Sequence, residues 1–193
     1  MQTPARALEV LTFWFADEHA VHWFAGNAGF DAQIRLHFAA TVAAASDGQL
    51  DEWAHTPDGW LALLIVLDQF RRNLYRDDAR AWAGDGKALA LALAGIARGD
   101  DQRVPTARRA FAYLPLEHAE DLALQNRCVA LFAALGVAAG PAQRATTDSF
   151  LDYARRHQRV IERFGRFPHR NALLGRTSTS AELAYLAEPG AGF

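Results

Sequence analysis

The hydrophobic residues of this chain recur at the spacing of amphipathic helices along almost its whole length. After Thr3-Pro4, for example, Leu8, Leu11 and Phe15 share one helical face. Similar patterns predict helices that begin at Asp31 and at Thr56-Pro57, a helical stretch over about 78–98 that is either continuous or broken around Gly84, and a short helix after Pro105. Further helices are expected over about 117–135 and 147–164 and from Thr179, which has Glu182 at capping-box spacing. No segment shows the strict apolar–polar alternation of a half-buried strand. The pattern therefore predicts an all-α protein of about eight helices.

The third of these helices carries the most hydrophobic stretch of the chain. The run WLALLIVL, from Trp60 to Leu67, is apolar on every face, so we expect it to form the central buried helix. Asp68 follows this run, where an ionised carboxylate opposes the helix dipole and loses its hydration. The carboxylate therefore requires a cation, and Arg72, four residues further along the same face, is the nearest candidate. Arg166 and Arg170 are the alternatives if their segment meets Asp68.

The length and net charge of the chain limit the number of domains and the kinds of partner that we expect. The chain has 193 residues and a formal net charge of −2, which suits one domain covering residues 1–193. This balance argues against a nucleic-acid partner, because such binding needs a basic surface. The single cysteine, Cys128, excludes an internal disulfide framework, and its apolar surroundings favour a buried role. There is no signal-peptide pattern and no apolar run near the ~20 residues that span a bilayer, so we expect a cytoplasmic protein without a membrane partner.

Two of the expected helices place ionisable side chains on faces that are otherwise apolar. In the helix expected to begin near Glu117, one apolar stripe continues backward to Asp121 and to Glu117 itself, and the neighbouring stripe continues to His118. In the helix that follows, His157 lies inside the apolar stripe. Two interpretations stay open. Acidic residues in a first turn also complement the helix dipole, and a buried histidine is usually satisfied by a nearby partner.

The segment RFGRFPHRNALLGR, from Arg163 to Arg176, concentrates positive charge in an otherwise mildly acidic chain. Gly165 is expected to end the preceding helix, and Pro168 keeps Phe167 extended, so that Phe167 can turn inward. The loop then presents Arg166, His169, Arg170 and Asn171. Loops on rigid helices commonly carry binding groups, but arginine and asparagine also satisfy the free carbonyls of helix ends.

Several segments together resemble a bacterial family. LTFWF, GQLDEWAHTPDGWLALLIVLDQFRRNLYR, PLEHAEDLALQ and HQRVIERFGRFPHRNALLGRTSTSAEL are similar, in this order, to the family known as domain of unknown function 924, from Val10 to Leu186. The resemblance implies a single-domain α-α superhelix, a right-handed stack like that of tetratricopeptide repeats, and it implies no activity. Arg71 replaces a proline usual in the family, so we expect the helix to continue through Asn73.

The first functional hypothesis is a helical module that binds a small anionic or zwitterionic ligand or the end of a peptide. Arginine suits carboxylate or phosphate recognition because its planar guanidinium donates two parallel hydrogen bonds. The predicted site consists of Asp68, Arg72, Glu117, His118, Asp121, His157, Arg166, His169, Arg170 and Asn171, with Trp14, Trp23 and Phe70 as walls.

Two further hypotheses belong to other classes. An enzyme of hydrolase type would use His118 or His157 as general base, oriented by Glu117 or Asp121, with Arg170 stabilising an oxyanion. Metal assistance is a variant of this hypothesis, but the ligand spacing matches no known motif, so we predict no metal site and no cofactor. Alternatively, the polar residues only fix the fold of a scaffold or a homo-oligomer, since exposed aromatic residues often mark interfaces.

Overall fold

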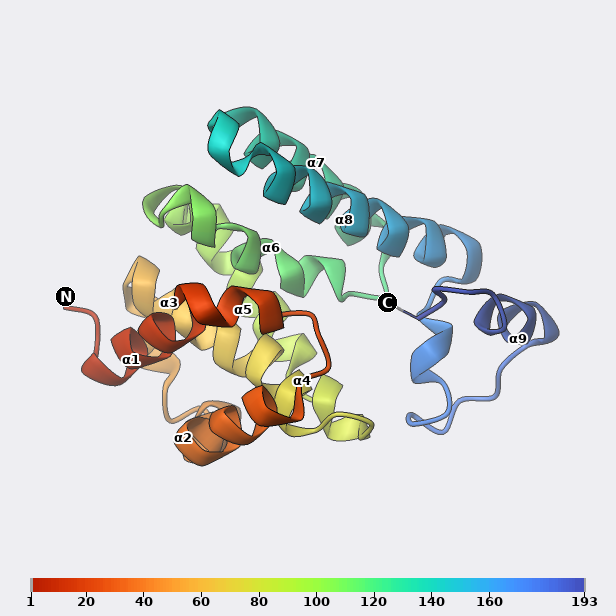
Figure 1. Cartoon of the computed structure of the whole chain (residues 1–193), viewed down its shortest axis with the longest axis horizontal. Helices are drawn as coiled ribbons and strands as arrows, with labels where there is room; N and C mark the ends of the chain where they lie inside the picture. Colours follow the sequence, from red (N-terminus) through yellow and green to blue (C-terminus); the bar gives the residue numbers. More distant parts are fainter. Residues whose placement is uncertain (1, 193) are drawn as a thin grey trace. The chain divides into compact units, whose positions relative to one another are not determined.

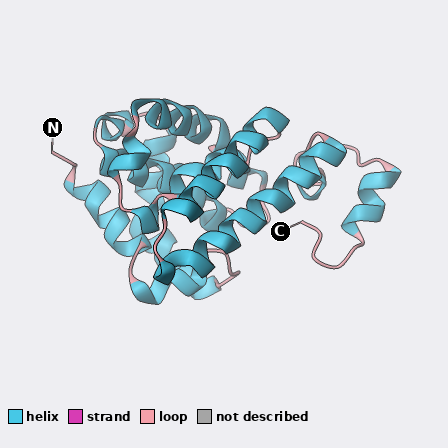
Figure 2. Ribbon diagram, turned by 90° about the horizontal axis from the view of Figure 1, so that it is seen from above, coloured by secondary structure: helices cyan, strands magenta, loops and turns pink. Residues whose placement is uncertain are grey.

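The computed structural model describes residues 2–192, and nine α-helices account for most of them (Figure 1). They are α1 (Ala5–Trp14), α2 (Ala28–Ser46), α3 (Pro57–Leu64), α4 (Arg71–Leu74), α5 (Asp85–Arg98), α6 (Ala110–Glu117), α7 (Leu122–Ala138), α8 (Arg144–Phe164) and α9 (Ser180–Leu186). Short 3₁₀ segments and one π-helical segment complete the regular structure, and no strand occurs within residues 2–192 (Figure 2). The prediction of an all-α protein is therefore confirmed for the described part of the chain.

Contacts divide the chain into two compact units, which are described separately. The first consists of the chain up to Arg76 together with Arg80–Pro115, and the second of Asp77–Ala79 and the chain from Leu116 onward. The single-domain organisation and the tetratricopeptide-like stack remain predictions. No helix within residues 2–192 is long and apolar enough to cross a bilayer.

The core of the first unit is the helix that the sequence predicts to be central. Thr56 caps α3, accepting the Gly59 N–H at 3.2 Å, and every residue of Trp60–Leu67 is buried. The chain then continues without a break through the π-helical segment Ile65–Phe70 into α4, so the helix does run on through Asn73. Helices α1, α2 and α5 pack against this continuous rod. Burial on all sides explains why its sequence is apolar on every face.

Aromatic rings fill the space between α1 and its neighbours in the first unit. The Trp14 ring centroid lies 5.6 Å from that of Phe70 and 5.6 Å from that of Phe111, in edge-to-face geometry. Trp23 stacks on Trp14 at 6.0 Å, and its Nε1 donates to the Trp14 carbonyl at 2.8 Å. Two of the three expected walls of a cleft, Trp14 and Phe70, are fully buried core residues, and Trp23 is half-buried.

In the second unit, α7 and α8 lie side by side as a helical hairpin (Figure 1). Helix α8 ends at Gly165, whose φ of 69° is the left-handed conformation predicted for this glycine. Helix α9 begins with the predicted capping box: Thr179 Oγ1 accepts the Glu182 N–H at 3.2 Å, and Glu182 Oε2 accepts the Thr179 N–H at 2.7 Å. Helix α9 packs against the 3₁₀ turn Pro168–Arg170.

The expected start of α2 was wrong. Asn27, and not Asp31, caps this helix, because its Oδ1 accepts the Phe30 N–H at 3.0 Å. Asp31 instead lies in the first turn, where its carboxylate accepts hydrogen bonds from Asn73 at 2.8 Å and from Arg76 at 2.8 and 2.9 Å. Asparagine and aspartate both cap helices well, so the sequence does not distinguish Asn27 from Asp31. The hydrogen bonds from Asn73 and Arg76, which are distant in the sequence, give Asp31 another role.

The expected helix over about 117–135 was also wrong at both ends. Glu117 is the last residue of α6, which accommodates Pro115 in its interior, and α7 begins only at Leu122 with Asp121 as its cap. Gly136 lies within α7, which ends at Ala138. The chain can break after Glu117 because Nε2 of Gln125 binds the carbonyls of Leu116, Glu117 and Ala119 at 3.3, 2.6 and 2.8 Å, and so satisfies the end of α6.

The contact between α3 and α5 yields a stability prediction. A Cβ added at Gly95 would lie 2.2 Å from Cε2 of Trp60, which is fixed by its own bond to the Leu91 carbonyl at 2.8 Å. We expect Gly95→Ala to lower the free energy of unfolding by about 2–3 kcal/mol, because the overpacked indole cannot move freely. Gly86→Ala, in the same helix with nothing within 4 Å, should raise it by about 0.5–1 kcal/mol. Urea denaturation of both variants checks this, and equal changes would contradict the close packing.

Candidate functional site

Asp68 and Arg72, the two predicted site residues of the first unit, form an ion pair. Arg72 Nη1 lies 2.9 Å from Asp68 Oδ1, and the Asp68 side chain is only 2% exposed. The Arg72 guanidinium also donates to both carboxylate oxygens of Asp85, at 3.0 and 3.1 Å, while Gln69 Nε2 donates to Asp68 Oδ2. The expectation that Arg72 neutralises Asp68 is confirmed. This network gives the buried Asp68 carboxylate a cation at the end of the apolar rod, which is a structural role.

In the second unit, five of the predicted site residues form one cluster, three of them against the buried ring of Phe167 and two against His157. They are Glu117, His118, His157, His169 and Arg170, and with Phe167 we call them the Phe167 cluster. Glu117 and His118 come from the end of α6, His157 from the middle of α8, and the others from the turn at 168–170. Three segments that are separate in the sequence thus bring their ionisable side chains to one place.

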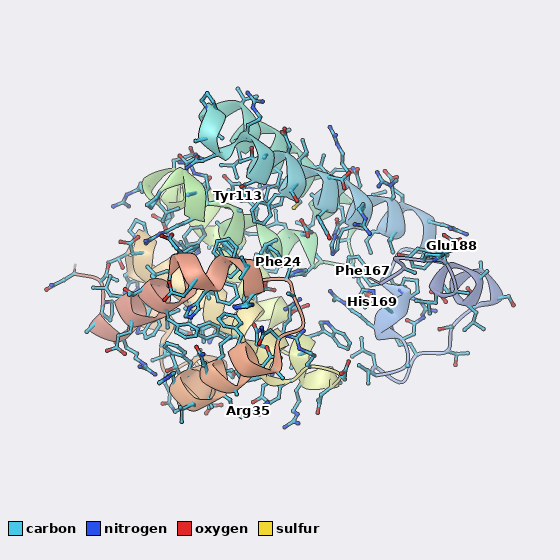
Figure 3. The ribbon with its side chains drawn as sticks, in the orientation of Figure 1. Phe24, Arg35, Tyr113, Phe167, His169 and Glu188 are labelled. Atoms are coloured by element: carbon cyan, nitrogen blue, oxygen red, sulfur yellow. The ribbon has the colours of Figure 1, made fainter. Side chains whose placement is uncertain are left out.

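Phe167 lies at the centre of this cluster because the backbone on either side forces it inward. Gly165 ends α8, and the extended Phe167, before Pro168, buries its ring completely. The His157 ring lies 5.5 Å from the Phe167 ring and the His169 ring 5.7 Å from it, between centroids; Figure 3 shows Phe167 and His169 beside each other. Cζ of Arg170 lies 4.6 Å from the same ring centroid, a cation–π contact.

His157 is held as a neutral imidazole. Burial, assisted by the positive potential of His118 and Arg170, lowers its pKa to about 3, while a hydrogen bond to the Tyr153 carbonyl opposes the change. Nδ1 lies 2.9 Å from this carbonyl and 3.3 Å from Oε1 of Glu117. Because the carbonyl can only accept, Nδ1 carries the proton, and Nε2 presents a lone pair. The His118 ring lies 6.2 Å from that of His157.

Cys128 is buried in the same unit and is not activated. Burial, with a smaller contribution from the charge of Glu117, raises the pKa of its thiol well above the usual range. The side chain is 0% exposed. The interpretation of Cys128 as a small buried hydrophobe is confirmed, because only a thiolate reacts readily as a nucleophile.

The remaining predicted site residues of the second unit have structural partners. Asp121 caps α7 and accepts the Leu124 N–H at 3.0 Å. Arg166 forms a two-pronged pair with Glu182 at 2.6 and 2.8 Å, which lowers the pKa of Glu182 to about 2. Asn171 donates to Ser178 at 3.0 Å and accepts from Arg176 at 2.9 Å. These contacts hold the loop after α8 in place.

Sequence reasoning missed the pair of Glu120 and Arg176, which positions Phe167. Arg176 donates to both Glu120 oxygens at 2.6 and 2.9 Å, and Glu120 Oε1 accepts the Phe167 N–H at 2.7 Å. Burial acts to raise the pKa of Glu120, but these hydrogen bonds outweigh it and hold the pKa below its usual value. The two residues are 56 positions apart, and no local pattern signals a contact over that distance.

Two pockets lie outside the predicted site. One, of about 280 Å³ in the first unit, is lined by Thr3, His55, Thr56, Pro57, Asp58 and Arg103. The other, of about 350 Å³ in the second unit, lies between α8 and the residues after α9. Within residues 2–192, no group of three or more histidine, cysteine, aspartate or glutamate side chains is arranged to hold a metal ion.

The comparisons with known proteins identify a family but no function. Residues 10–190 match the model of a family described as bacterial protein of unknown function, DUF924. The chain is also similar to a solved structure from Agrobacterium tumefaciens, the protein of unknown function ATU0120, with 38% sequence identity and a TM-score of 0.86. The similarity covers 96% of this chain and 99% of the other. No curated protein matches the sequence.

Loss of the buried charge of Asp68 should destabilise the protein more than loss of the charge of Asp85. We expect Asp68→Asn to lower the free energy of unfolding by about 3 kcal/mol, because it removes the buried charge that faces Arg72. Asp85→Asn, which removes the more exposed of the two carboxylates, should cost only about 1 kcal/mol. Denaturant unfolding measures both. A loss within experimental error for Asp68→Asn would contradict a buried ion pair.

The lowered pKa of His157 predicts acid sensitivity. In the unfolded chain this histidine takes up a proton near pH 6.5, whereas in the folded protein it stays neutral until about pH 3. Its contribution to stability is therefore complete above pH 6.5 and is lost as the pH falls toward 3, by about 3 kcal/mol at pH 4. We expect His157→Leu to flatten the unfolding free energy between pH 6.5 and 4, whereas the exposed His37→Gln should not. An unchanged slope in His157→Leu would refute a buried neutral imidazole.

Proposed function

We propose that this chain, which belongs to the DUF924 family of bacterial proteins of unknown function, binds a small anionic or zwitterionic molecule at the Phe167 cluster. The observation that carries the proposal is a cluster of five ionisable side chains from three separate segments, in which His157, His169 and Arg170 contact Phe167, and Glu117 and His118 lie beside His157. A purely structural network needs partners but does not need three histidines beside an arginine.

The chemistry of the cluster favours a carboxylate-bearing ligand, such as an organic acid, an amino acid or the end of a peptide. Arg170 is only 7% exposed and its Cζ lies over the Phe167 ring, so part of the entropic cost of binding an anion is already met. His169 against Phe167 and His118 beside His157 add ring nitrogens to the cluster. Glu117, whose Oε1 lies 3.3 Å from His157 Nδ1, supplies the negative charge that an ammonium group would need.

Catalysis by His157 is the weaker candidate. Its Nδ1–H is oriented by Tyr153 and Glu117, an arrangement seen in general bases. However, a pKa of about 3 makes Nε2 a poor proton acceptor at neutral pH, where an efficient base has a pKa near 7. The same environment suits a hydrogen-bond acceptor for a bound ligand. The scaffold hypothesis is supported by Asp121, Arg166 and Asn171, whose described contacts are structural.

We also propose that the protein is cytoplasmic and that it has no nucleic-acid partner. Cys128 is buried with an unreactive thiol, which suits a reducing compartment without requiring one. The net charge of −2 gives no general attraction to a phosphate backbone.

A thermal-shift experiment tests the proposal. The probes are acetate, succinate, glycine and glycylglycine at constant ionic strength, and at a hundred times its Kd a ligand should stabilise the protein by about 2.7 kcal/mol. We expect Arg170→Ala and the milder His118→Gln to remove the shift in Tm. Arg127→Ala, an exposed arginine on α7 in the same unit, should keep it. If no probe shifts the Tm, or if a shift survives in both cluster variants, the proposal is wrong.

A further inference from the structure

The 350 Å³ pocket of the second unit presents three arginines from one helix. Arg156, Arg159 and Arg163 recur in α8 at intervals of three and four residues, which places them on one side of the helix. The other lining residues are Val160, Phe164, Tyr185, Glu188, Pro189, Gly190 and Ala191. None of these residues belongs to the Phe167 cluster, so the pocket is a separate place in the second unit.

The pocket carries more positive charge than the protein neutralises. Arg159 is exposed and makes no hydrogen bond or ion pair with any residue between 2 and 192. Glu188 is the single acidic residue of the lining, and its carboxylate lies 4.0 Å from Nη1 of Arg163. Both side chains of this pair are more than half exposed, so the pair contributes little and exchanges readily for another anion. Arg159 therefore brings a positive charge that no described residue balances, and Arg163 offers a second one when Glu188 moves away.

Two of the three guanidinium groups are already oriented. Arg163 lies over the rings of Phe164 and Tyr185, with Cζ 4.7 and 6.0 Å from the two centroids. Arg156 lies over Tyr153 at 4.8 Å, and its Nη2 donates to the Gly190 carbonyl at 3.4 Å. A cation–π contact restrains a guanidinium without using up its N–H donors, which can then bind a phosphate through paired hydrogen bonds.

We propose that this pocket binds a small phosphomonoester, with its phosphate group held by Arg159 and Arg163. A phosphate carries nearly two negative charges at neutral pH, which matches the excess charge of the lining. It also displaces Glu188 from Arg163 at little cost. Val160, Phe164 and Pro189 give the pocket an apolar part, which suits the carbon skeleton of an ester better than free inorganic phosphate. This inference is independent of ligand binding at the Phe167 cluster.

Isothermal titration of the full chain tests the inference, with inorganic phosphate, glycerol 3-phosphate and adenosine 5′-monophosphate as probes at constant ionic strength. We expect at least one of the two esters to bind more tightly than inorganic phosphate. Arg159→Ala should weaken that binding about tenfold or more, because it removes a charge-assisted hydrogen bond. Arg155→Ala removes an equally exposed arginine of α8 that does not line the pocket, and its Kd should stay within about twofold of the wild-type value.

Further variants distinguish a specific pocket from diffuse attraction to a basic helix. Glu188→Gln should tighten ester binding by removing the competing carboxylate, and His118→Gln, in the Phe167 cluster, should leave it unchanged. An equal loss in Arg155→Ala and Arg159→Ala would overturn the proposal, because binding would then follow the overall charge of α8. Failure of every probe to bind would also overturn it, and so would binding of inorganic phosphate that neither ester exceeds.

Discussion

A carboxylate that leaves water must find a cation or several hydrogen-bond donors, and this constraint organises both units of the protein. In the first unit the apolar rod ends in Asp68, and Arg72 is positioned between that carboxylate and Asp85. In the second unit the buried carboxylate of Glu182 accepts hydrogen bonds from Arg166 and from the Thr179 N–H, which fixes the chain after α8. Helix packing builds the two cores, but these ion pairs decide where the loops lie.

The features that the sequence predicts well are those whose signals are local. The caps at Thr56 and Thr179 and the end of α8 at Gly165 depend on residues within four positions, and each lies where expected. The helix continues through Asn73 because Arg71, unlike a proline, can donate a backbone hydrogen bond and does not break the helix. The pair of Asp68 and Arg72 is of the same kind, because one helical turn separates the two residues.

The features that the sequence does not reveal depend on contacts between distant segments. Pro115 looks like a helix boundary, but α6 continues past it to Glu117, and Gln125 from the next helix supplies the donor that ends it. The sequence suggests Asp31 as a helix cap, but in the structure its oxygens accept hydrogen bonds from Arg76 and Asn73. For the candidate site, the sequence predicted that His118, His157 and Arg170 approach one another, and within the second unit they do. It could not identify Phe167 as the ring against which His157 and Arg170 lie.

The arginines from 163 to 176 differ in whether a carboxylate binds both sides of the guanidinium group. Arg166 and Arg176 are matched by Glu182 and Glu120 in two-pronged pairs, and both pairs hold the loop that carries the turn at 168–170. Arg163 instead lies over two rings, and its carboxylate partner is 4.0 Å away. A guanidinium over a ring keeps edge donors for another partner, whereas one that forms two bonds to a carboxylate does not. The proposed phosphate site therefore uses Arg163 and not Arg166 or Arg176, whose donors are taken by carboxylates.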